Sequence, residues 1–299
     1  MKFKNLILFR TVLIVIILFF ISIGAFAQSA DSLNQKRVKK FYIYGGGTYV
    51  GSLIALNELW YADYPRSDFH TFNDNAQWLQ VDKVGHLYSA FSLSKLNYAV
   101  LTGSNSNTNK QAALVSAITS FAFLTTVEVF DGFSQEWGFS WGDMAANTVG
   151  AGLFLGQQIL FEKQVLQLKY SYHETELREL RPNTLGQNNL QGAFKDYNGQ
   201  TYWASLNLNG VYKKVKPKWL NLAFGYGGEG MLYANNESIY KGAKSYRQYY
   251  LSLDVDFEQI ETNSKWLKAL FKVANCIKVP APTLELNENG GSEFHWLYF

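Results

Sequence analysis

Two short strings in the first half of the chain carry the side chains best suited to chemistry. In DKVGHLYSAF, Asp82 and His86 are four residues apart and would share one face of a helix. The second string, EVFDGFSQEWGFSWGDMAANTVGAG, ends one apolar segment with Glu128 and Asp131 and opens the next with Asp143. Carboxylates beside an imidazole can exchange protons or hold a divalent cation. The pattern therefore predicts a polar cluster where these helix ends meet.

This cluster has three interpretations, and the residues alone leave all three open. In the first, it is an acid–base or metal-dependent hydrolase or transferase site acting on envelope material, with the candidate catalytic residues Asp82, His86, Glu128 and Asp143. In the second, it binds a lipid or glycolipid headgroup beneath a lid formed by the loop from Tyr61 to Trp78. The candidate binding residues are Lys83, Asp131, Ser140, Asn147, His70 and Asp74. In the third, the same groups satisfy one another in a buried network, because burying them without partners is costly.

Established metal and nucleophile motifs are missing from the sequence. No HExxH string and no Gly-x-Ser-x-Gly elbow occurs, and Gly45 to Gly47 is not followed by the Gly-Lys-Ser/Thr of a phosphate loop. The single cysteine, Cys276, excludes a multi-cysteine metal site and an intrachain disulfide. We therefore assign no metal ligand, expect no cofactor, and favour a non-enzymatic role.

At these positions the chain resembles the VanZ-like membrane proteins. The shared order is Asp-Lys-x-x-His opening a helix, a Glu ending an apolar helix, and Ser-x-x-Asp-x-x-x-Asn-x-x-Gly opening the next. The matching residues are Asp82, Lys83, His86, Glu128, Ser140, Asp143, Asn147 and Gly150. A more specific likeness, with Gly85 and the string from Trp137 to Asn147, is to predicted periplasmic lipoproteins of unknown function typified by YfiM. The resemblance spans about a quarter of the chain and implies a cell-envelope location, but no reaction.

The resemblance has two departures. VanZ-like proteins commonly carry a basic residue before Ser-x-x-Asp, and the string Glu136 to Phe139 has none. The cysteine is far from the predicted signal cleavage site, so it is not expected to carry a lipid.

Four apolar segments must position these residues: Tyr42 to Leu59, Val84 to Val100, Ala112 to Phe130 and Met144 to Phe161. They are rich in small residues, which let helices approach closely. Three of them have uncharged runs of about 16 to 18 residues, just below the usual bilayer-spanning length. They are compatible with short membrane spans, re-entrant pieces or the buried helices of a soluble bundle.

The second half of the chain changes to a period of two. Apolar and polar residues alternate in Tyr202 to Leu208, Leu220 to Tyr226 and Tyr249 to Phe257, which predicts antiparallel strands. Helical spacing returns from Ser264 to Ile277, with Ser264 as the predicted N-cap. The glycines at 225, 227, 228 and 230 predict a bulge or turn. The predicted fold class is therefore α+β: an N-terminal bundle of about four apolar helices, then a mainly antiparallel sheet with one late helix.

The N-terminus predicts export. Basic residues, an apolar run and Ala25-Phe26-Ala27 form a secretory signal peptide cleaved after Ala27. The predicted organisation is a signal peptide at 1–27, a VanZ/YfiM-like helical domain at 41–161 and a β-rich region at 162–299 packed on the helical part.

The composition indicates which classes of partner the protein could bind. Cleavage removes three of the positive charges from a chain of net charge +3, and the neutral remainder gives no reason to expect a nucleic-acid partner. A charged fraction of 17%, with abundant Tyr and Trp, favours contact with a membrane or an envelope lipid. We expect a membrane-associated protein of the cell envelope, with the periplasm or outer membrane favoured over the inner membrane. The sequence does not define the oligomeric state.

Overall fold

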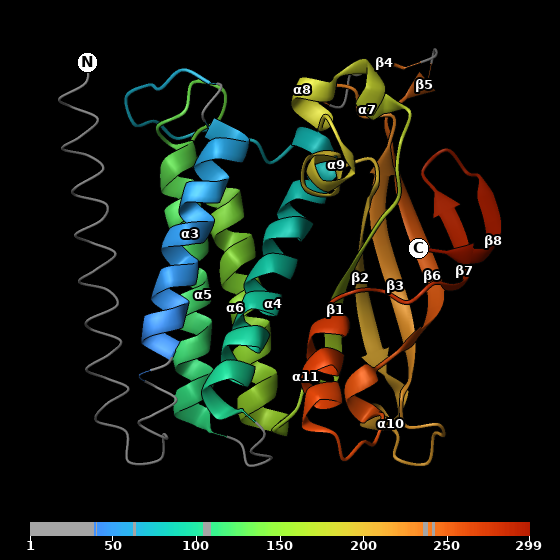
Figure 1. Cartoon of the computed structure of the whole chain (residues 1–299). Coiled ribbons are helices and arrows are strands. Elements are labelled where there is room, and N and C mark those ends of the chain that lie inside the picture. The colour runs from blue at the N-terminus through green and yellow to red at the C-terminus, as the bar shows by residue number, and fades with distance from the viewer. Residues whose placement is uncertain (1–38, 40, 62–63, 104–108, 236–238, 241–242) are drawn as a thin grey trace.

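The computed structural model describes residues 39, 41–61, 64–103, 109–235, 239–240 and 243–299. The predicted signal peptide lies outside these residues. The fold is α+β, with the long helices preceding a six-stranded antiparallel sheet (Figure 1). The predicted fold class is confirmed at this level.

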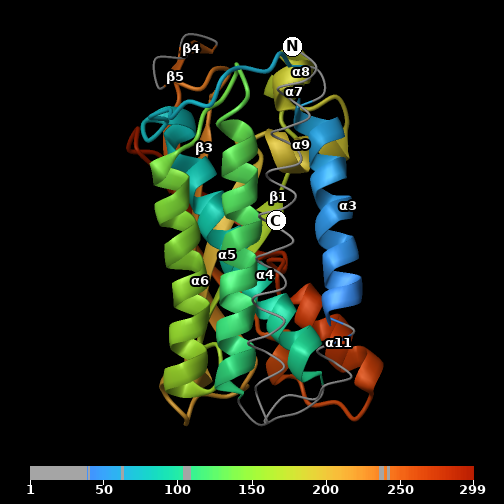
Figure 2. The same cartoon turned by 90° about the vertical axis from the view of Figure 1, so that its left-hand side faces the viewer.

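In the described part of the first half, four α-helices lie side by side, and Figure 2 shows them running along a common axis. They are α3 (Gly46–Leu56, flanked by π-helical turns at Phe41–Gly45 and Asn57–Tyr61), α4 (Val81–Thr102), α5 (Lys110–Asp131) and α6 (Trp141–Phe161). Asn109 and Ser140 cap α5 and α6, because their side chains accept hydrogen bonds from the first helical turn. Phe91 and Phe154 are fully buried in the core where α4, α5 and α6 meet.

The sheet has the strand order β1-β2-β3-β6-β7-β8, and all neighbouring strands are antiparallel. The strands are β1 (Leu166–Tyr172), β2 (Gln200–Asn207), β3 (Leu220–Glu229), β6 (Tyr246–Val255), β7 (Ala281–Asn287) and β8 (Ser292–Tyr298). Two short strands, β4 (Ile239–Tyr240) and β5 (Ala243–Lys244), pair separately.

Helices of the second half are more numerous than predicted. The late helix is α11 (Lys265–Ala274), and Ser264 caps it as expected. The remaining helices there are α7 (Leu177–Leu180), α8 (Pro182–Leu185), α9 (Asn189–Lys195) and α10 (Leu208–Val211), with a 3-10 turn at Phe257–Gln259. Another 3-10 turn, Gln77–Gln80, directly precedes α4 in the first half. The prediction of one late helix was imprecise because elements of one or two turns are too short to show an apolar period.

The two faces of the sheet have opposite polarity, with polar side chains on the buried face. Lys169 and Asp254 form an ion pair there at 2.8 Å, and both side chains are 0% exposed. On the other face, apolar residues lie opposite one another across the strands and remain exposed. We call this the outer face, and its exposed residues are Phe224, Tyr249, Leu251, Leu253, Leu284, Leu286 and Phe294. Alternation in the sequence predicted these strands but not which face would be buried.

Helix α4 covers the β1–β2 part of the outer face. The ring of Tyr88 lies 5.9 Å from that of Tyr170 and 5.6 Å from that of Tyr202. The helical half is thereby fixed against the sheet at the start of α4, beside the predicted polar cluster.

The glycine-rich strand was predicted to form a bulge or a turn, and the structure shows the turn. Gly225, Gly227 and Gly228 pair in continuous register with β6. A Cβ at Gly225 would lie 2.8 Å from the ring of Trp203, so the glycine makes room for this buried ring. Gly230, at φ +79°, provides the predicted turn after the strand.

Candidate functional site

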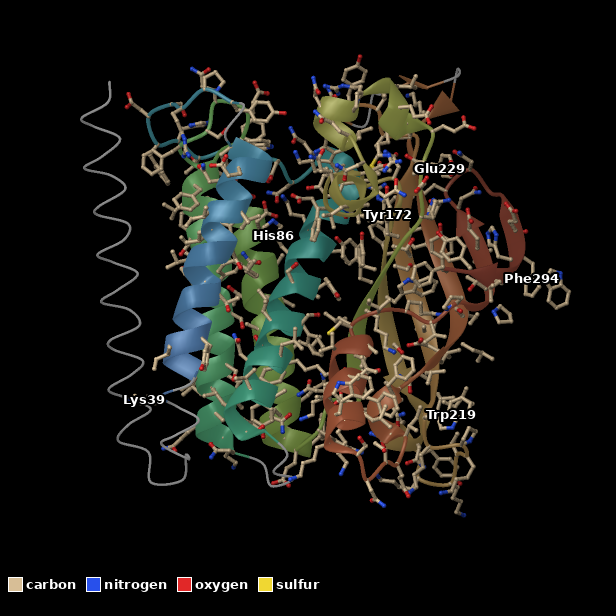
Figure 3. All side chains as sticks on the ribbon, in the orientation of Figure 1. Lys39, His86, Tyr172, Trp219, Glu229 and Phe294 are labelled. Carbon is tan, nitrogen blue, oxygen red and sulfur yellow. The ribbon has the colours of Figure 1, made fainter. Side chains whose placement is uncertain are left out.

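The structure brings most of the predicted polar residues to one end of the helical half. His86, labelled in Figure 3, lies within that half of the molecule. We call the group the acid–histidine cluster, and its members are Asp74, Asp82, Lys83, His86, Glu128, Asp131, Ser140, Asp143 and Asn147. The start of α4, the end of α5, the start of α6 and the two loops before α4 and α6 contribute these side chains.

A left-handed turn orients the start of α4. Trp78, Leu79 and Gln80 have φ values of 49°, 51° and 63°, a conformation that costs free energy for residues other than glycine. The sheet holds this turn in place. The hydroxyl of Tyr226 donates to the carbonyl of Leu79, and Arg247 donates to Oε1 of Gln80 at 2.7 Å. The β-rich half therefore helps to position Asp82 and Lys83, which follow directly.

Close packing of α6 on α4 places Asn147 against His86. A Cβ at Gly150 would lie 2.1 Å from the carbonyl oxygen of Leu87, so only glycine allows this approach. One turn earlier on α6, Oδ1 of Asn147 lies 3.2 Å from Nδ1 of His86. The distance is that of a hydrogen bond, which fixes the orientation of the imidazole ring.

Lys83 links three of the carboxylates. Its Nζ lies 2.7 Å from Asp74, 3.1 Å from Asp82 and 2.8 Å from Asp143. Asp74 also accepts a hydrogen bond of 2.6 Å from the hydroxyl of Ser140, the residue that caps α6. The predicted lid loop thus contributes one carboxylate directly to the cluster.

His86 faces two of the same carboxylates and also Glu128. Its Nε2 lies 3.6 Å from Oε1 of Glu128 and 3.9 Å from Oδ1 of both Asp82 and Asp143. The atoms offered by Asp82, His86 and Asp143 all lie within 4.8 Å of one another, which allows them to share a metal ion.

Hydrogen bonding in the cluster is incomplete. Glu128 is 1% exposed, and its Oε2 accepts a bond of 3.2 Å from the backbone N–H of Ser140. Its Oε1 accepts none, and Nδ2 of the fully buried Asn147 donates none. An unsatisfied buried polar atom costs about 1–3 kcal/mol, so these atoms need an explanation.

Burial and mutual repulsion shift the protonation of the cluster. Burial, together with Asp143 and Asp131, raises the pKa of Glu128 to about 9. Burial likewise raises the pKa of Asp131 to about 7. Burial alone would lower the pKa of His86, but the carboxylates of Asp143, Asp82 and Glu128 outweigh it and raise that pKa to about 9. At neutral pH a protonated Glu128 and an imidazolium would face each other, so the cluster can store protons or exchange them for a cation.

Two tyrosines complete the cluster, and the predicted site residues did not include them. The hydroxyl of Tyr197 donates to Oδ1 of Asp82 at 2.7 Å, and that of Tyr61 donates to Oδ1 of Asp131 at 2.8 Å. Tyr197 comes from the segment between α9 and β2, more than a hundred residues from Asp82 in the chain, and no motif marks it.

His70 is placed apart from these groups. Its Nδ1 lies 3.3 Å from the hydroxyl of Ser67 and 3.2 Å from the carbonyl of Asp68. Backbone hydrogen bonds from His70 to Gly132 and from Phe72 to Phe139 tie its loop to the segment before α6. Among the predicted binding residues of the loop, Asp74 makes contact with the cluster through Lys83 and Ser140.

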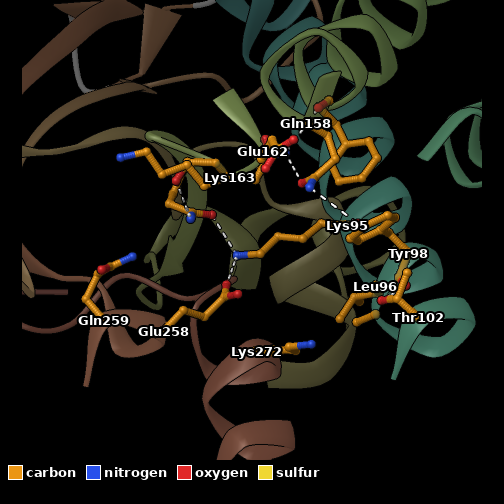
Figure 4. Close-up of a pocket in the computed structure, with 14 residues that line it drawn as sticks. Lys95, Leu96, Tyr98, Thr102, Gln158, Glu162, Lys163, Glu258, Gln259 and Lys272 are labelled. Carbon is orange, nitrogen blue, oxygen red and sulfur yellow. Dashed lines mark hydrogen bonds and ion pairs between the residues drawn. The ribbon is translucent and has the colours of Figure 1, made fainter. Parts of the chain in front are cut away.

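A second polar site lies toward the other end of α4, in a pocket of about 180 Å³ (Figure 4). Lys95 crosses it and contacts Glu258 at 2.5 Å and Gln167 at 2.6 Å. These partners satisfy the ammonium group, which distinguishes this pocket from the acid–histidine cluster.

The fold and the cluster together define an α+β protein whose helical half carries a buried acid–histidine site. Residues 68–156 match the family described as "Predicted periplasmic lipoprotein (DUF2279)". The matched stretch contains α4, α5 and most of α6, whereas the sheet lies outside it. Comparison with curated proteins and with solved structures returned no match. The match supports the coarse prediction: this is an exported, envelope-associated protein that resembles a family of unknown function.

Proposed function

We propose that this protein is a non-enzymatic, membrane-associated component of the cell envelope that binds a lipid surface with the outer face of its sheet. We also propose that the chain is related to the YfiM-type lipoproteins and the VanZ-like membrane proteins. Its signal peptide would be cleaved after Ala27. The observation that carries it is the reversed polarity of the sheet.

The outer face is suited to hydrocarbon rather than water. Phe224, Leu251, Leu253 and Leu286 expose between 41% and 52% of their surface, and they lie on adjacent strands. The same strands bury ionic and amide groups on their other face. In water the arrangement would be unfavourable, because each exposed apolar Å² forgoes about 25 cal/mol of burial free energy. Lipid acyl chains would remove this cost.

Helix α11 provides a second surface of the kind that binds membranes. Trp266, Leu270 and Val273 form one exposed apolar face, and Trp266 is 69% exposed. Lys265 and Lys268 lie on another exposed face of the helix. A basic amphipathic helix with exposed Trp and Leu favours the surface of a membrane that contains anionic lipids.

Helix α5 is long and apolar enough to cross a bilayer by length and composition, with half of its apolar window buried inside the protein. The core helix of a soluble protein meets the same criterion. The proposal therefore rests on the outer face of the sheet and on α11.

Flotation with vesicles of phosphatidylethanolamine and phosphatidylglycerol tests the proposal. We expect the wild-type protein to float with the vesicles and the L251E/L253E variant to lose most of this binding, because two charges would enter the outer face. The matched control N183E/Q187E adds the same charges to an exposed polar segment and should float like the wild type.

Two results would contradict the proposal. One is equal flotation of L251E/L253E and the wild type. The other is a stable dimer in the absence of lipid that dissociates in L251E/L253E, which would assign the outer face to a second copy of the chain.

A further inference from the structure

We propose that Asp82, His86, Glu128 and Asp143 bind a divalent cation of the Mn²⁺ or Zn²⁺ class. The inference does not depend on the proposed lipid contact, since it rests on side chains inside the helical half.

The imidazole of His86 lies among three carboxylate oxygens that could share a metal ion with it. Nε2 of His86 is 3.6 to 3.9 Å from one oxygen each of Asp82, Glu128 and Asp143. Metal–ligand bonds of about 2.0–2.2 Å place neighbouring ligand atoms roughly 3.4 Å apart in a tetrahedral site. Ligand atoms of Asp82, His86 and Asp143 all lie within 4.8 Å of one another. Side-chain movements of about an ångström would therefore close them, together with Oε1 of Glu128, around one small cation.

The unpartnered oxygen of Glu128 independently supports a bound cation. The residue is 1% exposed, and its Oε1 points toward His86 without accepting a hydrogen bond. Burial of a carboxylate oxygen without a hydrogen-bond donor is unfavourable in free energy unless a cation or a proton compensates it. A metal ion between Glu128 and His86 would satisfy this atom.

The surrounding contacts orient the ligand atoms. If Nδ1 of His86 donates to Asn147, the lone pair of Nε2 faces the carboxylates, which is the tautomer that a metal requires. Tyr197 donates to Oδ1 of Asp82, the oxygen that faces His86. Lys83 pairs with the other oxygen of Asp82 and with Oδ1 of Asp143. These are the outer contacts expected around metal-binding histidines and carboxylates.

Charge favours a dication over a further hydrogen-bond donor. Two cations, Lys83 and His86, pair with this cluster in the described part of the chain. With Glu128 protonated, the four other carboxylates of the cluster, Asp74, Asp82, Asp131 and Asp143, exceed these two cations by two even when His86 is charged. A divalent ion would take the place of the protons on His86 and Glu128 and leave both groups as ligands.

The ligand set indicates the metal class, and the site is open enough to receive it. One imidazole with several carboxylates suits Zn²⁺ or Mn²⁺, whereas Ca²⁺ prefers six to eight oxygen ligands. Asp82 and His86 expose 19% and 18% of their side chains, so an ion can enter from their side.

Isothermal titration of the full-length, EDTA-treated protein in mild detergent, with MnCl₂ and ZnCl₂ as titrants, tests the inference. We expect one site per chain. H86Q and E128Q should each weaken binding at least tenfold, and N147A, which removes only an orienting contact, should weaken it about tenfold. The matched controls H70Q and E136Q change the same residue types outside the cluster and should bind like the wild type.

The inference fails if the wild type shows no saturable binding of either metal, or if H86Q and E128Q bind as tightly as the wild type. Thermal melting of each variant verifies folding, and D82N replaces any variant that does not fold. Vesicles are absent from this titration, so its failure would leave the lipid contact standing, and loss of flotation would leave the metal site standing.

Discussion

The sheet and the helical half both bury charged side chains, but these are fully paired at one site in the sheet and only partly paired in the helical half. In the sheet, Lys169 and Asp254 pair at 2.8 Å, Lys169 also donates to a backbone carbonyl, and Asp254 accepts from Ser205 and from a backbone N–H. In the acid–histidine cluster, carboxylates outnumber cations and Oε1 of Glu128 has no donor. A buried network that is matched in charge and hydrogen bonds needs only a structural role. One left incomplete is a candidate for binding something else.

Breaking the matched pair should have the largest effect. D254N leaves the Lys169 ammonium without its counter-charge in a fully buried site, so we expect a loss of about 3–5 kcal/mol in the free energy of unfolding. Urea unfolding in mild detergent measures it. The double variant K169M/D254N should recover part of the loss. A loss below about 1 kcal/mol for D254N would show that the pair does not stabilise the sheet.

Lys278 should make the stability of the sheet depend on pH. Burial lowers the pKa of Lys278 from its usual 10.5 to about 8, although Asp254 opposes the shift. Between these two values the unfolded chain holds a proton that the folded chain has released, so stability rises with pH across this window. We expect a gain of about 2 kcal/mol between pH 8 and pH 10 that is absent in K278M. Equal pH profiles for K278M and the wild type would contradict the assignment.

Neutralising the unmatched carboxylate should have the smallest effect, and the opposite sign. At neutral pH Glu128, whose pKa is raised to about 9, must take up a proton when the chain folds, whereas a glutamine of the same size is neutral in both states. The metal-free E128Q protein should therefore be more stable by about 1 kcal/mol. Thermal melting in EDTA measures this change, with E136Q as the control. Marked destabilisation by E128Q would place Glu128 in a satisfied structural network like that of the sheet.

The spacing of residues in the sequence predicted more of the cluster than of its surroundings. Asp82 and His86 on one helical face, and Ser140 capping the helix of Asp143, follow from local rules, and the structure places these residues together. The contact of Tyr197 with Asp82 depends on how the two halves pack, and no local pattern encodes it.

The sequence also did not predict which face of the sheet is buried, or the left-handed turn before α4. Alternating residues predicted strands, but burial of the polar face depends on what covers each side. The left-handed turn at Trp78 to Gln80 uses residue types that rarely adopt it, and contacts from Tyr226 and Arg247 in the sheet hold it.

The most direct test is an anomalous difference map from crystals of the full-length protein grown with ZnCl₂ and measured at the zinc edge. We expect one strong peak about 2.0–2.2 Å from Nε2 of His86 and from carboxylate oxygens of Asp82, Glu128 and Asp143. A map with no peak there, or with zinc only at other groups such as Glu293 and His295, would contradict the proposed metal site and make the cluster a proton-sharing structural network.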